Sequence, residues 1–422
     1  MTHAPRLDSL WSETAPERTR YAPLSESITV DVVVIGGGFT GVSAAYHLAA
    51  GGASVALLEA RTIGFGGSGR NVGLVNAGLW TPPDEVEGKI GKTTGRQLNE
   101  LLAGGPSTVF DLIEKHQIRC EATRRGTLHC AHSQAGLRDL ENRFAQQEAR
   151  GAPVKLLDAA ETARRIGSAA YCGALWDGRA GTIQPLAYVQ GLASAAEGQG
   201  ARIFEDTSAL SMTETGEGWT VRTAEGEVRA VRLIQATNAY GAGAADDNAI
   251  IPAHFFQLAT APLPDDLRHS ILAGGEGCWD TALVMSAFRL DQAGRMIFGA
   301  LGNLEGFGGA FHRGWAHRKL SRLFPQLKDI PFEQEWTGRI AMTGTHLPRI
   351  ERRGKTGISI FGYSGRGICP GTLFGRAAAD WALGTGDLPL PICDPQSESY
   401  AAVKGLYFET GATLTHFTNG RF

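Results

Sequence analysis

The chain first shows a clear pattern at residues 30–38, where the continuous apolar run VDVVVI is followed by three glycines. An unbroken β-branched run is typical of a strand buried on both faces, as in a parallel sheet. Residues 39–52 then place Ala, Leu and small residues at helical spacing and end in a glycine pair suited to a helix C-cap. Residues 53–60 form a second apolar run. Together they predict one βαβ unit with a right-handed crossover.

The rest of the chain alternates between the same two periodicities. Helical spacing recurs at 91–118, in a charged stretch ending near 150, and at 186–199 and 372–386. Strand-like runs occur at 122–131, 201–206, 219–237 (a hairpin feeding a buried strand) and 357–365. Residues 251–345 change to short alternating strands, with a helical interlude near 313–324. This change of pattern predicts a parallel sheet from the buried runs on either side of residues 251–345, and a separate antiparallel sheet from residues 251–345 themselves.

Length and charge narrow the class of protein. A chain of 422 residues is too long for one ordinary domain, which predicts two or three. The net charge is −3, and Lys and Arg are spread along the chain, so no basic footprint for nucleic acid is expected. No run of about 18 apolar residues occurs, which predicts no membrane span. The first 28 residues are polar and lack a signal-peptide core, so a cytoplasmic location is expected.

The six cysteines show neither C-x-x-C pairs nor histidines at metal-binding spacing. We therefore expect reduced core thiols and no metal site. Glycine is more informative than cysteine, because its 56 copies are about twice the average usage of roughly 7%. Clusters of glycine mark places where the backbone turns tightly or approaches a ligand.

The first glycine cluster matches a dinucleotide-binding turn. Gly36, Gly38 and Gly41 form G-x-G-x-x-G between the first buried strand and the helix that follows. Gly36 permits the turn, Gly38 lets the backbone approach a pyrophosphate, and Gly41 lets helix and strand pack closely. The amides at the helix start then face the anion. Glu59 ends the second strand, 18 residues after Gly41, where a carboxylate accepts hydrogen bonds from ribose hydroxyls.

Two further glycine-rich segments favour FAD over NAD. RTIGFGGSGRNVG at residues 61–73 directly follows the second strand, where a nicotinamide enzyme carries an ordinary helix. GYSGRGICPG at 362–371 lies about 300 residues later, in another strand-to-helix turn. Backbone amides in that turn suit the negatively charged N1/O2 edge of a reduced flavin. Two such turns, far apart in sequence, suit a cofactor as long as FAD, whereas NAD needs only the first.

These motifs resemble the FAD-dependent D-amino-acid oxidase-like family, which includes the glycine and sarcosine oxidases. The resemblance covers residues 30–390, including LIQATNAY at 233–240 and GTIQP at 181–185. GFGGSGRNVG and GYSGRGI are most similar to the γ-glutamylputrescine oxidoreductase group. The family commonly has His in the second glycine turn, where this chain has Arg366. Motifs and resemblance together assign non-covalent FAD binding to Gly36, Gly38, Phe39, Thr40, Gly41, Glu59, Ala60, Arg61, Gly67, Ser68, Gly69, Arg70, Asn71, Val72, Gly73, Ala236, Thr237, Gly365, Arg366, Gly367 and Ile368.

The resemblance implies oxidation of a C–N bond in an amine or amino acid, with hydride transfer to flavin N5 and hydrolysis of the imine. The expected catalytic residues are Arg339, as partner of a substrate carboxylate, Arg366, as a positive charge near the flavin, and His346, which would hold the amine neutral. Arg289 and Arg349 are alternative partners for a substrate carboxylate, and His254 is the alternative to His346. Trp336, Tyr363 and Phe256 are aromatic candidates for the pocket wall, and Cys369 is a possible flavin-linking thiol.

The predicted fold is an α/β Rossmann-type FAD-binding domain with an interleaved α+β substrate domain built on an antiparallel sheet. The FAD-binding domain is predicted to gather residues 1–85, 150–250 and 346–422, and the substrate domain 86–149 and 251–345. Oxygen, a quinone or a partner protein is the expected electron acceptor. Two other functions stay open, a flavin hydroxylase fed by NAD(P)H and a non-catalytic flavin-binding module. The absence of a second G-x-G-x-x-G disfavours the hydroxylase.

Overall fold

The computed structural model describes residues 9–18, 20–241 and 249–418, so both chain ends of the predicted FAD-binding domain lie outside the described part. The first sheet confirms the predicted βαβ unit, with parallel β1 and β2 on either side of helix α2 in sequence. In the first sheet the strands are β1 (Ile28–Ile35), β2 (Val55–Leu58), β8 (Arg202–Phe204), β9 (Ser211–Thr215), β10 (Gly218–Arg222), β11 (Glu227–Gln235), β17 (Arg349–Arg353) and β18 (Gly357–Phe361).

The strand order is β17-β18-β11-β1-β2-β8, and all neighbours are parallel except β17 and β18. The hairpin β9–β10 joins at β11 in antiparallel fashion. Alternate side chains of β1 enter different cores, because successive residues of a strand point to opposite faces. Val32 and Val34 pack among the helices, whereas Val33 and Ile35 pack with Trp219 of the hairpin. Burial on both faces explains the continuous apolar run in the sequence.

The second sheet has the order β16-β12-β15-β14-β13-β4-β6-β5 and is antiparallel except at the β13–β4 pair. Its strands are β4 (Thr127–Cys130), β5 (Val154–Leu157), β6 (Ala174–Asp177), β12 (Ile251–Pro262), β13 (Gly277–Asp280), β14 (Ser286–Leu290), β15 (Arg295–Leu301) and β16 (Phe332–Met342). Residues 150–250 thus contribute strands to both sheets, since β5 and β6 pair here. A two-stranded sheet joins β3 (Leu74–Val75) to β7 (Gly181–Thr182).

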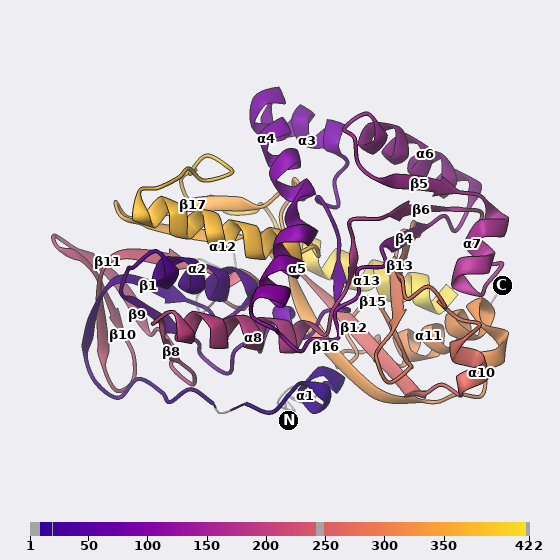
Figure 1. The fold of residues 1–422 in the computed structure, drawn as a ribbon, viewed down its shortest axis with the longest axis horizontal. Helices are drawn as coiled ribbons and strands as arrows, with labels where there is room; N and C mark the ends of the chain where they lie inside the picture. Colours follow the sequence, from indigo (N-terminus) through magenta and orange to yellow (C-terminus); the bar gives the residue numbers. More distant parts are fainter. Residues whose placement is uncertain (1–8, 19, 242–248, 419–422) are drawn as a thin grey trace.

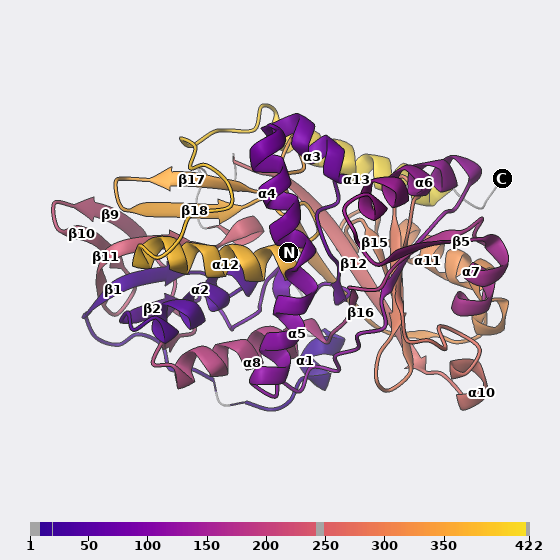
Figure 2. The ribbon, with the colours of Figure 1, turned by 45° about the horizontal axis from the view of Figure 1, so that its top comes forward.

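The helices cover the sheets and fill the space between them (Figures 1 and 2). They are α1 (Leu10–Thr14), α2 (Phe39–Ala50), α3 (Pro83–Ile90), α4 (Lys92–Ala103), α5 (Gly105–Lys115), α6 (Gln134–Glu148), α7 (Ala159–Ile166), α8 (Pro185–Gly198), α10 (Asp265–Arg268), α11 (Gly309–Leu323), α12 (Ile368–Leu383) and α13 (Ala401–Thr418). Short 3-10 turns are η1 (Gly67–Gly69), η2 (Asn238–Tyr240) and η3 (Pro325–Leu327). The α/β plus antiparallel-sheet fold class is confirmed. In the described residues, none of the helices has the length and hydropathy needed for a membrane span.

Helix α12 lies against α2 on the first sheet, and two glycines make this possible. A β-carbon on Gly375 would lie 2.4 Å from the Thr40 carbonyl oxygen, and one on Gly371 would lie 3.1 Å from Cβ of Phe39. Both helices begin directly after glycine turns that follow β1 and β18. These two helix N-termini therefore lie side by side at the carboxyl edge of the parallel strands, where open α/β sheets bind ligands.

Helix α13 was not among the predicted elements, and it is held by a buried histidine pair. His416 packs on Trp315 of α11 with ring centroids 3.8 Å apart, and its Nδ1 lies 2.7 Å from Nδ1 of His312. Burial, together with the smaller effects of the nearby charges of His312, Lys319 and Arg318, lowers the pKa of His416 to about 3. The native state therefore favours neutral His416 at neutral pH.

We expect this pair to make stability depend on pH. The unfolded state binds a proton at His416 once the pH falls below its ordinary pKa near 6.5, whereas the folded state does not. The free energy of unfolding should then fall by about 1.4 kcal/mol per pH unit between roughly pH 6 and pH 3. Denaturant titrations with saturating FAD should show a shallower fall for His416→Gln than for the wild type. Equal slopes in the two proteins would refute this assignment.

Candidate active site

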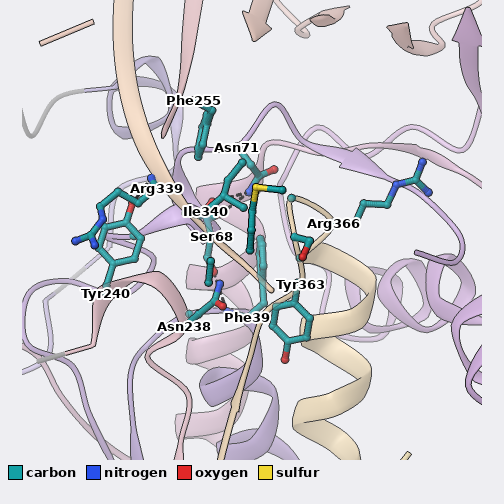
Figure 3. Close-up of a pocket in the computed structure, with 18 of the residues that line it drawn as sticks. Phe39, Ser68, Asn71, Asn238, Tyr240, Phe255, Arg339, Ile340, Tyr363 and Arg366 are labelled. Atoms are coloured by element: carbon teal, nitrogen blue, oxygen red, sulfur yellow. Dashed lines mark hydrogen bonds between the residues drawn. The ribbon is translucent and has the colours of Figure 1, made fainter. Parts of the chain in front are cut away.

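A cavity of about 790 Å³ lies where the two sheets meet and is also bordered by α13. Figure 3 shows its central part, with side chains from both sheets and from the starts of α2 and α12. Its size falls within the range of small-molecule and cofactor sites. Most of the sequence-predicted cofactor residues line it, namely Gly36, Gly38, Phe39, Thr40, Glu59, Ala60, Gly67, Ser68, Asn71, Val72, Ala236, Thr237, Gly365, Arg366, Gly367 and Ile368. Gly41, Arg61, Gly69, Arg70 and Gly73 do not appear in its lining.

The first glycine turn leaves backbone uncovered at the cavity wall. Gly36 has φ +106°, and a β-carbon there would lie 2.8 Å from the Ala236 carbonyl oxygen. A β-carbon on Gly41 would lie only 1.9 Å from the Gly36 carbonyl oxygen, so Gly41 serves the packing of α2 on the turn. Gly38 is the N-cap of α2 and borders the cavity. A β-carbon added at Gly38 would lie 2.9 Å from Oγ of Ser68. These three positions match the roles assigned to a dinucleotide-binding turn.

Glu59 stands at the end of β2 with its carboxylate fixed by backbone donors. The Gly37 amide donates to Oε2 at 2.7 Å, and the Arg61 amide donates to Oε1 at 2.9 Å. Burial raises the pKa of Glu59, and these two hydrogen bonds act against that rise. Each carboxylate oxygen keeps further acceptor capacity, which suits a diol such as a ribose. Arg61 takes part through its main chain, since its side chain is exposed.

The segment around η1 crosses the cavity and is rigidly tied. Ser68 Oγ accepts from the Phe39 amide at 3.0 Å, which anchors this segment to the start of α2. The Asn71 side chain donates to the carbonyls of Gly67 and Ser68 and accepts from the Gly73 amide. Arg70 turns away from the cavity and donates to the carbonyls of Phe65 and Thr337. The segment is thus held from both ends before any ligand binds.

The second glycine turn connects β18 to α12 and contains three positive φ angles. These are +88° at Gly362, +50° at Ser364 and +94° at Gly365. Asn238 accepts from the Gly362 amide at 3.0 Å, and the Tyr363 hydroxyl lies 2.7 Å from Oγ1 of Thr40. The Tyr363 bond joins the two glycine turns directly. Both turns therefore face one cavity, although they lie about 300 residues apart in sequence.

The three predicted catalytic residues all line the cavity, from different sides. The Arg339 guanidinium lies 5.8 Å from the centre of the Tyr240 ring, and Figure 3 shows it at one side of the cavity, opposite Arg366. Arg366 donates to the Ala77 carbonyl at 3.1 Å and lies 4.5 Å from the Trp279 ring centre. His346 has φ +59°, and burial lowers its pKa, with the Lys89 charge acting in the same direction. His346 is therefore neutral at pH 7.

Several alternative candidates are held by contacts within the protein. Arg289 donates to the carbonyls of Val72, Leu290 and Ile183 and does not line the cavity. Arg349 pairs with Glu398, and His254 lies 3.9 Å from Glu409. Trp336 is buried and donates to the Arg70 carbonyl at 2.8 Å. Cys369 borders the cavity as a buried thiol whose pKa is raised by burial, so it is not a thiolate.

The strand β12 shows what the sequence analysis missed. Phe256 was the candidate for the pocket wall, but it is buried in the core of the second sheet. Its neighbours Phe255 and Gln257 line the cavity instead, because alternate residues of a strand face opposite sides. Trp279 of β13 and Tyr407 of α13 also border the cavity. Alternation along β12 signals two faces but does not indicate which one the cavity takes.

Comparison with known proteins decides the family. A model of the FAD dependent oxidoreductase family (DAO) matches residues 31–381. The chain belongs to this family. It is 34% identical over 381 residues to Gamma-glutamylputrescine oxidoreductase of Escherichia coli (strain K12), with 88% of each chain covered. It is 24% identical over 365 residues to Glycine oxidase of Geobacillus kaustophilus (strain HTA426), covering 83% of this chain and 92% of that one.

Solved structures agree with this family at the level of fold. The crystal structure of glycine oxidase from Geobacillus kaustophilus has a TM-score of 0.71 at 20% identity, covering 88% of this chain and 99% of that one. L-Proline dehydrogenase from P. horikoshii has a TM-score of 0.69, covering 88% and 98% of the chains at 20% identity. The predicted family, the dependence on FAD and the oxidoreductase class are therefore confirmed. The chain is an FAD-dependent oxidoreductase of the amine and amino-acid oxidase type.

Proposed function

We propose that this enzyme oxidises a C–N bond in a γ-glutamylputrescine-like amine or another secondary amine or amino acid. The observation that carries the proposal is the 34% identity, over 88% of both chains, to an enzyme named for γ-glutamylputrescine. The cavity supports it, because its lining combines the two glycine turns with side chains of the second sheet. A cofactor held at the turns would thus have a substrate space beside it.

The glycine turns fit an elongated dinucleotide. The uncovered backbone at Gly38 and the start of α2 would hold the pyrophosphate, and Glu59 would accept hydrogen bonds from ribose hydroxyls. The amides of residues 365–368, at the start of α12, would meet the flavin end. A β-carbon on Gly367 would meet nothing within 4 Å, so this turn leaves open space beside the backbone. When bound, FAD would accept the hydride, with its two electrons, that leaves the substrate.

The side chains around the cavity would position the amine and keep water out. The substrate loses a hydride from carbon and a proton from nitrogen, and the resulting imine hydrolyses in water. Phe255 and Tyr363 provide an apolar wall against which the reacting carbon would rest. Neutral His346 is able to accept a proton, so it would keep the amine in its reactive, uncharged form. Arg339, with no carboxylate partner among the described residues, would bind an acidic group near the reacting carbon.

We expect His346→Asn to alter the pH profile as well as the rate. Asparagine tolerates the left-handed backbone at this position, so the fold should survive the change. If His346 acts as the base, kcat/KM should fall by roughly 100-fold or more. The acidic limb of the wild-type profile, which lies below pH 6.5 because burial lowers the pKa, should disappear. Stopped-flow flavin reduction from pH 5 to 9 measures both effects. His269→Asn serves as the control, and an unchanged acidic limb in His346→Asn would disprove this role.

Anaerobic mixing separates this function from the two alternatives. Purified holoenzyme is mixed with γ-glutamylputrescine, sarcosine, glycine and D-amino acids, and separately with NADH and NADPH. Bleaching of the flavin by an amine supports the proposal. Bleaching by NAD(P)H alone indicates a hydroxylase, and no bleaching by any compound indicates a non-catalytic module. Reoxidation of the bleached enzyme by oxygen or by a quinone then identifies the electron acceptor.

We further propose a reducing, cytoplasmic setting. All six cysteines are free thiols in the structure. Disulfides are rare in cytosolic proteins, so this state agrees with that compartment. Within the described ranges, no group of three or more His, Cys, Asp and Glu side chains is arranged for a metal ion.

A further inference from the structure

A second cavity, of about 550 Å³, adjoins the FAD cavity. Asn76, Trp279 and Arg366 line both cavities, so the two meet at these side chains. The second cavity is bordered by α3, α4 and α6 and by strands β4 and β6 of the second sheet, at His129 and Asp177. A ligand that reached from one cavity into the other would therefore pass Trp279 and Arg366.

Arg366 brings a positive charge to this junction without a matching negative charge. Its guanidinium stacks on Trp279 and donates to one carbonyl, that of Ala77. Burial, together with the Arg143 charge, lowers its pKa to about 10, and the Asp177 charge acts in the opposite direction. No carboxylate in the described part of the chain forms an ion pair with Arg366. Arg366 is half-buried, and a partly desolvated cation without an ion-pair partner favours an anion beside it.

Two further side chains of the same cavity each keep one nitrogen without a hydrogen-bond partner among the described residues. Arg143 donates through Nε to Asp139 and through Nη1 to the Trp80 carbonyl, and its Nη2 has no hydrogen-bond partner among the described residues. His129 is 5% exposed, and its buried Nε2 has no hydrogen-bond partner. Its ring stacks on Trp279 at 3.3 Å between centroids. The pKa of His129 is lowered by burial first, and then by the charges of Arg143 and Arg366.

The other charged residues of the cavity are ion-paired or exposed, and Arg143 is itself ion-paired through Nε with Asp139 at 2.7 Å. Arg179 is paired with Asp177 at 2.6 Å. Arg150 is paired with Glu87 and with Asp84, each at 2.7 Å. Arg96 and Glu100 are exposed. The Arg366 guanidinium, Nη2 of Arg143 and Nε2 of His129 therefore remain as donors available to an anion.

We propose that this second cavity binds a carboxylate that the substrate carries at a distance from the oxidised C–N bond. The inference rests on the proposed amine oxidation and narrows its substrate class. The reactive amine would lie in the FAD cavity, and the chain of the substrate would pass Trp279. The remote carboxylate would accept hydrogen bonds from Arg366 and Arg143, with a third from His129 in its Nε2–H tautomer. Amines with a γ-glutamyl end have this layout, whereas glycine and sarcosine do not.

Equilibrium binding tests the second cavity without requiring turnover. The probe is γ-glutamylbutylamide, which carries the remote carboxylate and lacks the oxidisable amine. Calorimetric titration into FAD-loaded wild type should give saturable binding. Arg143→Met should weaken it roughly 10- to 100-fold, the scale of a lost charge-assisted hydrogen bond. Arg96→Met, at the exposed rim, should bind as the wild type does. Absence of binding to the wild type, or equal affinity in Arg143→Met, would overturn the inference.

A kinetic comparison of two matched substrates, with and without the remote carboxylate, gives a second test of the inference. γ-Glutamylputrescine is compared with its carboxyl methyl ester in wild type, Arg143→Met and Arg366→Met. Arg143→Met should raise KM roughly 10- to 100-fold for the acid, with kcat within a few fold, and should leave the ester unaffected. An equal effect of Arg143→Met on both compounds would overturn the inference. If no amine bleaches the flavin, the proposed function is wrong. The calorimetric titration tests the carboxylate site separately, because it measures binding without turnover.

Discussion

Gly38→Val should purify as a folded but colourless protein. Gly38 caps α2 at the cavity wall, where the backbone would approach the pyrophosphate of FAD. A β-carbon alone would come within 2.9 Å of Ser68 Oγ, and the two methyl groups of valine would extend from it. Overpacking a tight site costs about 1–3 kcal/mol, and the cofactor would also lose its contact with the backbone amides. We expect FAD affinity to fall at least roughly 100-fold, which is about 2.7 kcal/mol.

Absorbance of the bound flavin, divided by protein concentration, measures this loss. Gly198→Val is the matched control, because a β-carbon at Gly198 would meet nothing within 4 Å and the site lies at the end of α8. Circular dichroism on both variants separates loss of cofactor from loss of fold. Gly38→Ala should retain part of the flavin, since the Ser68 side chain is able to rotate away. A fully yellow Gly38→Val would place the pyrophosphate elsewhere.

Glu59→Gln should weaken FAD binding by a comparable amount. The carboxylate accepts from the amides of Gly37 and Arg61, and a glutamine would turn its NH2 group towards one of these two donors. The variant would also lose a charged acceptor for the ribose hydroxyls. Hydrogen bonds to charged groups contribute about 1.5–3 kcal/mol, so we expect FAD affinity to fall roughly 10- to 150-fold.

Fluorescence titration of the apoenzyme with FAD gives the affinity directly. Glu148→Gln, on an exposed face at the end of α6, is the control and should bind FAD normally. The FAD affinity of Glu59→Asp should lie between those of Glu59→Gln and Glu148→Gln, because aspartate keeps the charge but has a shorter side chain. Unchanged affinity in Glu59→Gln would show that Glu59 only braces the first glycine turn.

The parts of the fold that the sequence predicted are those dictated by backbone chemistry. A strand must be apolar wherever both of its faces are buried, and β1 is apolar and buried from Val32 to Ile35. The turns around Gly36 and Gly362 need positive φ, so their glycines mark them in the sequence. These local requirements were enough to predict the βαβ unit and the second glycine turn, and both turns line one cavity. Helix 91–118 was predicted as one element but is divided at Gly104 into α4 and α5.

The remaining features depend on tertiary packing, which a single sequence does not encode locally. Phe255 and Phe256 are equivalent in composition, and only the side on which β12 packs decides which one faces the cavity. The direction of the Arg366 side chain is set by Trp279, which lies 87 residues earlier. Helix α13 carries Gly405 and Gly411 and is held by the buried His416, so neither propensity nor periodicity marks it clearly.

The central claim is that glycine turns at both ends of the chain hold one FAD molecule. A crystal structure of the yellow holoenzyme tests it most directly. The account predicts a pyrophosphate against Gly38 and the start of α2, ribose hydroxyls on Glu59, and the isoalloxazine edge against residues 365–368. An isoalloxazine bound away from the 365–368 turn, or a pyrophosphate away from Gly38, would contradict it.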